Sequence, residues 1–68
     1  MRIAIAIDAW KLPIFSRHLE QSGLTYEQGP GLTHDTLHFY IETDDPALVE
    51  KVARAANREA ALAQERKL

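Results

Sequence analysis

Seven residues near the start of the chain alternate strictly between large apolar side chains and small or charged ones. Residues 2–8 read RIAIAID, which places Ile3, Ile5 and Ile7 on one side of an extended chain. A period of two with β-branched residues on one side is typical of a strand with one buried face. We therefore expect a sheet with one face covered by the rest of the chain and the other face open.

Two further segments have strand character. Residues 37–42 alternate in the same way, with Leu, Phe and Ile on one side and His, Tyr and Glu on the other. Residues 24–28 are a shorter candidate, which the Gly-Pro-Gly sequence at 29–31 interrupts. We expect these residues and those that follow, up to about residue 36, to form a loop.

Two helices are expected from apolar stripes with helical spacing. Residues 12–22 carry one stripe, Pro13 suits the first turn of that helix, and Gly23 suits the position just after its end. The second helix begins where Asp45 provides a cap residue and Pro46 the first helical position. Its pattern continues almost to the end of the chain.

The element order is therefore strand, helix, strand, strand, helix. We expect one α+β domain over residues 1–68, built as a two-layer sandwich with both helices on one face of the sheet. The third strand is expected between the other two, in a three-stranded mixed sheet. This order resembles a ferredoxin-like fold without its last strand. Such a likeness implies an architecture and no activity.

Composition excludes several classes of protein. The 68 residues include no cysteine, so disulfides and thiolate metal sites are impossible. No apolar run approaches the ~18 residues of a membrane span, and the net charge of −2 lacks the basic excess of a nonspecific nucleic-acid binder. We expect a cytoplasmic protein that holds no cofactor and contacts neither membrane nor nucleic acid.

Few residues suggest catalysis or metal binding. No serine lies in a nucleophile elbow, and His18 falls beside the apolar stripe of the first helix. A metal or ligand site is an alternative that stays open, because Asp8, His34, His38 and Glu42 supply histidine and carboxylate ligands of a suitable type. Nothing in the sequence fixes their convergence.

The open face of the expected sheet is unusual, because it carries alanine and aromatic residues where long polar side chains are normal. The first strand also lacks the proline or inward charge that protects an edge. We expect a small, self-associating interaction module, without enzymatic activity, that forms a homodimer or binds and inhibits a larger protein. The alternative is a ligand- or metal-binding protein with its site at the dimer sheet face. The expected interface residues are Ala4, Ala6, His38, Tyr40, Ala60, Leu62 and Ala63.

Overall fold

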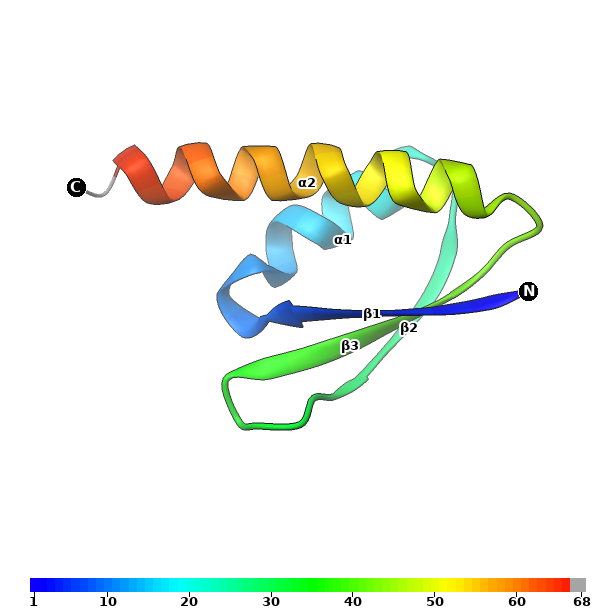
Figure 1. The fold of residues 1–68 in the computed structure, drawn as a ribbon, viewed down its shortest axis with the longest axis horizontal. Coiled ribbons are helices and arrows are strands. Elements are labelled where there is room, and N and C mark those ends of the chain that lie inside the picture. Colours follow the sequence, from blue (N-terminus) through cyan, green and yellow to red (C-terminus); the bar gives the residue numbers. More distant parts are fainter. Residues whose placement is uncertain (67–68) are drawn as a thin grey trace.

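The computed structural model of the chain describes residues 1–66. Along these residues the chain forms an α+β fold in the expected element order (Figure 1). The elements are β1 (Arg2–Asp8), the 3-10 turn η1 (Ala9–Lys11), α1 (Leu12–Gln21), β2 (Thr25–Pro30), β3 (Thr36–Glu42) and α2 (Pro46–Arg66). Neither helix, as far as the structure describes it, is long and apolar enough to cross a membrane.

The three strands form one sheet in the order β1-β3-β2. The central position of β3 confirms the expected arrangement. Both β1 and β2 pair with β3 in the antiparallel sense. Although β1 and β2 run parallel to each other, β3 separates them, so no two neighbouring strands are parallel. The sheet is antiparallel throughout, and the expectation of a mixed sheet is wrong.

The alternation of each strand decides which residues are buried. In the β1–β3 ladder Ile5 lies opposite Phe39, and Ala6 lies opposite His38. Both helices lie on one face of the sheet (Figure 1). The isoleucine side of β1 packs into the core beneath them, and the alanine side forms the open face. Phe39 and Ile41 are fully buried under the helices, both at 0% exposure. The buried core consists of Ile7, Phe15, Leu19, Phe39, Ile41, Val49, Val52 and Ala56.

Helix α1 has the expected ends. It starts one residue before Pro13, and the 3-10 turn η1 separates it from β1. Gly23, just after the helix, has a φ of 71°. The amide of Gly23 donates to the Glu20 carbonyl and the amide of Leu24 to the Leu19 carbonyl, both at 3.1 Å. This pair of bonds is the Schellman arrangement, in which a left-handed glycine ends a helix.

Strand β2 is longer than the sequence suggests. The Gly-Pro-Gly sequence predicts that the strand ends at residue 28, but β2 continues to Pro30. A Cβ atom on Gly29 would lie only 3.0 Å from the Tyr40 ring, and one on Gly31 would lie 2.2 Å from Thr36 Oγ1. The glycines therefore allow β2 to remain close against β3 where we expected a loop.

Helix α2 extends beyond the sheet that it covers (Figure 1). Asp45 caps its start, since Asp45 Oδ1 accepts a hydrogen bond from the Leu48 amide at 3.2 Å. The helix has 21 residues, which is about 32 Å at ~1.5 Å per residue. The seven residues of β3 span only about 24 Å at ~3.4 Å per residue. The excess length projects at the C-terminal end of α2.

Candidate functional site

The open sheet face has a centre of small and aromatic residues. Ala4 and Ala6 of β1 are exposed there and lie opposite Tyr40 and His38 of β3, respectively. On the other side of β3, Gly29 of β2 lies opposite His38. The structure thus brings together four of the expected interface residues on one uncovered surface.

The two aromatic side chains of this face contact each other and their neighbours. The ring centroids of His38 and Tyr40 are 6.0 Å apart, and the Arg2 guanidinium lies 4.8 Å from the Tyr40 ring centroid. His38 Nδ1 is 3.1 Å from the Pro30 carbonyl oxygen. Because a carbonyl oxygen only accepts, Nδ1 carries the proton and donates it to this bond. In the neutral ring this leaves Nε2 as an acceptor.

The outer edge of β1 offers unpaired backbone groups. Just beyond the two ends of the β1–β3 ladder, the Thr43 amide donates to the Met1 carbonyl at 2.9 Å and the Ala9 amide to the Asp35 carbonyl at 2.7 Å. Both pairs fit the register that places Ile5 opposite Phe39. Hydrogen-bonded pairs recur at every second residue of an antiparallel ladder. The odd-numbered residues of β1 therefore bond to β3, and the even-numbered residues direct their N–H and C=O groups outward.

The outer edge of β2 is different because it contains a proline. The Gly31 amide donates to the Thr36 carbonyl at 3.2 Å, which places the bonded pairs of this ladder at the odd-numbered residues of β2. The nitrogen of Pro30 therefore faces outward, and it has no hydrogen to donate. A proline in this position protects an edge strand against pairing with another strand. The edge of β1 has no such protection.

The residues of the metal alternative do not converge. Asp8 lies opposite Thr36 at one end of β3, and Glu42 lies opposite Arg2 at the other end, about 20 Å away at ~3.4 Å per residue. His34 is in the β2–β3 loop, with its side chain 92% exposed and 3.3 Å from Asp35. Across residues 1–66, no cluster of three or more such ligands has the geometry to hold a metal ion.

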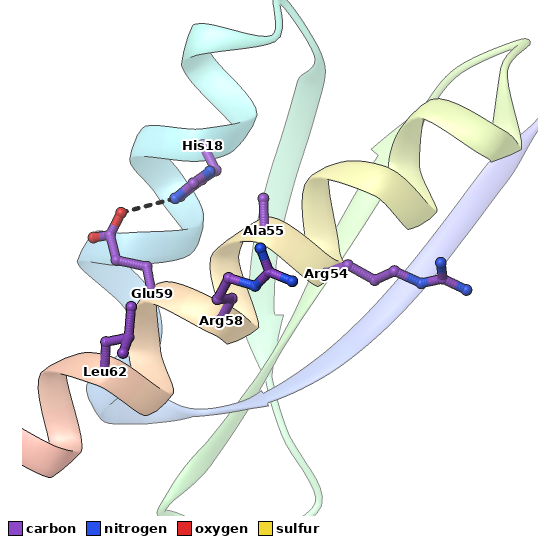
Figure 2. Close-up of a pocket in the computed structure, with 6 residues that line it drawn as sticks. All are labelled: His18, Arg54, Ala55, Arg58, Glu59 and Leu62. Carbon is purple, nitrogen blue, oxygen red and sulfur yellow. Dashed lines mark hydrogen bonds and ion pairs between the residues drawn. The ribbon is translucent and has the colours of Figure 1, made fainter.

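A groove of about 470 Å³, which no pattern in the sequence predicts, lies between the two helices (Figure 2). His18 Nε2 of α1 donates a hydrogen bond of 3.0 Å to Glu59 Oε1 of α2, and Arg17 donates to the other oxygen of the same carboxylate. Arg54 bonds Glu50 on its own helix at 2.5 Å. The lining residues are His18, Arg54, Ala55, Arg58, Glu59 and Leu62.

The polar contacts of Glu59 in this groove join α1 to α2. His18 and Glu59 are 41 positions apart in the sequence, so no local spacing connects them. The only indication in the sequence was that His18 falls beside an apolar stripe. Glu59 accepts hydrogen bonds from two α1 residues, which satisfies its carboxylate within the chain. The arrangement is that of a helix–helix contact.

The interface residues expected on α2, unlike those on the sheet, are not all accessible to a partner. Ala60 is 1% exposed, so the chain itself already covers it and it offers no surface to a partner. Leu62 is 48% exposed, and Ala63 is half-buried. Both line a hollow beside Arg17 of α1. Only the last part of the expected apolar stripe is therefore accessible.

Comparisons with protein families, with curated proteins and with solved structures found no match for this chain.

Proposed function

We propose that this protein is a small interaction module that self-associates through the outer edge of β1. The observation that carries the proposal is the contrast between the two edges of the sheet. Arg2, Ala4 and Ala6 of β1 direct free N–H and C=O groups outward and Asp8 directs its N–H outward, whereas Pro30 interrupts the outer edge of β2. An unprotected edge is a template for an additional strand, and main-chain hydrogen bonds provide the affinity in this mode of recognition.

The topology supports the same edge. Connections between parallel strands through a helix are right-handed in nearly all proteins. Because β3 runs opposite to β1 and both helices lie on one face, a strand continuing from α2 in the same hand would lie beyond β1. We propose that residues 1–68 form a ferredoxin-like sheet without its last strand, and this position is the one that the last strand would fill. Within residues 1–66 no strand occupies that position.

The open face remains accessible when the edge is paired. Its alanines and its aromatic pair of His38 and Tyr40 give a surface suited to a second, larger protein partner. A small-ligand site on this face has less support. The hollow beside Tyr40, about 280 Å³, is rimmed by Arg2, Glu27 and Glu42 and holds no convergent set of histidines and carboxylates among the described residues.

A proline substitution in each edge tests the proposal. Ala6 and Gln28 both direct their N–H groups outward, so proline at either position leaves the bonds to β3 intact. We expect Ala6→Pro to remain folded and become monomeric, because it removes one donor from the β1 edge. Gln28→Pro is the matched control on the β2 edge, and we expect it to associate like the unchanged chain.

Sedimentation velocity provides the measurement. We expect the unchanged chain to sediment as a dimer of twice its 7.7 kDa mass at about 0.1 mM, where a stable interface is populated. Circular dichroism verifies that both proline variants are folded. A monomeric unchanged chain at this concentration would overturn the proposal, as would a folded Ala6→Pro variant that still dimerises.

A further inference from the structure

We infer that two copies of the chain pair through β1 in antiparallel orientation, centred on Ile5, so that Arg2 of each copy faces Asp8 of the other. This inference rests on the proposed function, since it specifies the partner and the register at the same edge. The arrangement has a twofold axis, and each copy contributes the same seven residues, Arg2–Asp8. The result is a continuous sheet of six strands.

The positions of the free backbone groups restrict the register. The outward-directed residues of β1 are Arg2, Ala4, Ala6 and Asp8. In an antiparallel pair these residues must lie opposite outward-directed residues of the partner to exchange hydrogen bonds. Only a register centred on Ile5 pairs all of them, with Arg2 opposite the partner's Asp8 and Ala4 opposite the partner's Ala6. A shift of two residues in either direction leaves part of the strand unpaired.

The charges of β1 match this register. The strand begins with a cation and ends with an anion, and both side chains lie on the open face. Opposite charges directly across a strand pair stabilise it, and like charges destabilise it. In the Ile5-centred register the two ends of the interface each hold one Arg2–Asp8 pair. Neighbouring charges remain within reach, because Asp8 lies 3.8 Å from Lys11 and Arg2 lies opposite Glu42.

The helix side of the same edge has room for the partner's side chains. Ile3 and Ile5 are only half-buried in the single chain. A hollow of about 260 Å³ lies along the edge, with Ile5, Ile7 and Asn57 in its lining. In the proposed register the partner's Ile5 lies beside Ile5 and the partner's Ile3 beside Ile7. The isoleucines of the two copies therefore cover surface that each copy alone leaves exposed.

Cysteine cross-linking tests the register directly, because the natural sequence contains no cysteine. Ile5 lies on the axis at a non-hydrogen-bonded position, where the two Cα atoms approach to about 4.5 Å and a disulfide is possible. We expect Ile5→Cys to form a covalent dimer under mild oxidation. Ile3→Cys is the matched control on the same face. Its two copies would be about 13 Å apart, and we expect no efficient cross-link.

Charge exchange provides a second test that does not change the buried residues. Arg2→Asp places two anions at each end of the interface, and Asp8→Arg places two cations there. We expect each variant alone to self-associate about tenfold more weakly than the unchanged chain at low salt. We expect a mixture of the two variants to form a heterodimer with restored affinity, because every end then holds opposite charges. Native mass spectrometry distinguishes the species by mass.

The outcomes separate the register from the proposed function. Cross-linking of Ile5→Cys without Ile3→Cys, together with recovery in the mixture, supports the inference. Self-association at the edge stands if the unchanged chain dimerises and the Ala6→Pro variant does not. The register is nevertheless overturned if Ile3→Cys cross-links as efficiently as Ile5→Cys. If Ile5→Cys does not fold, the charge exchange alone decides, and a mixture no stronger than its components overturns the register. A monomeric unchanged chain overturns both proposals.

Discussion

Of the three glycines, Gly31 has the least room for a side chain. A Cβ atom there would lie 2.5 Å from the backbone carbonyl carbon of Thr36, as well as against its hydroxyl oxygen. The Thr36 backbone is held by two hydrogen bonds, from the Gly31 amide to its carbonyl and from its own amide to the Thr33 carbonyl, and it cannot turn aside as a side chain can. We expect Gly31→Ala to lower the free energy of unfolding by about 1–3 kcal/mol, the usual cost of overpacking. Urea denaturation measures this loss.

Gly29→Ala is the control for this prediction. Its Cβ atom would meet the outer edge of the Tyr40 ring at 3.0 Å. That ring is half-exposed on the open face, so it is free to shift by a few tenths of an ångström. We expect a smaller loss of stability than for Gly31→Ala. Equal losses for the two variants would show that the close approach of Gly31 to the Thr36 backbone is not the cause.

The sequence predicts the facing of individual residues well and their contacts across the chain poorly. Alternation alone places Ile5 under the helices and Ala6 on the open face, because side chains of a strand alternate between its two faces. No such rule relates His18 to Glu59, which meet only because two helices pack together. The hydrogen bond from His38 to Pro30 likewise depends on β2 continuing beside β3.

Glu59 makes the principal polar contact between the two helices. Its carboxylate accepts from Arg17 and His18, and its side chain is 40% exposed. We expect Glu59→Ala to lower the free energy of unfolding by about 1 kcal/mol, since partly exposed pairs contribute ~0.2–1 kcal/mol each. Urea denaturation at low salt and in ~1 M salt measures the loss, and we expect salt to reduce it.

Glu50→Ala is the matched control, because Glu50 bonds Arg54 within the same helix and joins no other element. A pair of this kind contributes only ~0.2–0.5 kcal/mol. We expect the loss for Glu50→Ala to be about half that for Glu59→Ala or less. If the two substitutions had equal effects, Glu59 would not hold α1 against α2.

At the scale of elements, the sequence predicts helix limits better than strand limits. Both helices begin with a proline in the first turn, preceded in α2 by the cap residue Asp45, and α1 ends just before the left-handed Gly23. The end of β2 was misplaced because Gly-Pro-Gly is typical of a turn, whereas here the glycines allow close approach to β3. The antiparallel sheet follows once β3 separates the two parallel strands, which the expectation of a mixed sheet did not take into account.

The whole molecule is long and narrow, at 39 Å along its longest axis and 15 Å along its shortest. Figure 1 is viewed down the shortest axis, with α2 along the longest, so the narrow dimension crosses the three strands. Pairing through β1 would widen the sheet in this dimension and leave the open face unchanged. Pairing through the open face would instead add a layer below the sheet. The two arrangements expose different residues.

Ala6→Arg distinguishes these two arrangements in the intact protein. Ala6 is exposed on the open face and lies opposite His38. If this face were the dimer interface, the added charge would be buried there and would cost several kcal/mol of association. In edge pairing the arginine side chain extends over the open face into solvent. We expect the free energy of unfolding of the variant to change by less than about 0.5 kcal/mol. We expect the variant to sediment as a dimer. A variant that melts normally but sediments as a monomer would move the interface to the open face, and Tyr40 and His38 would then contact the partner.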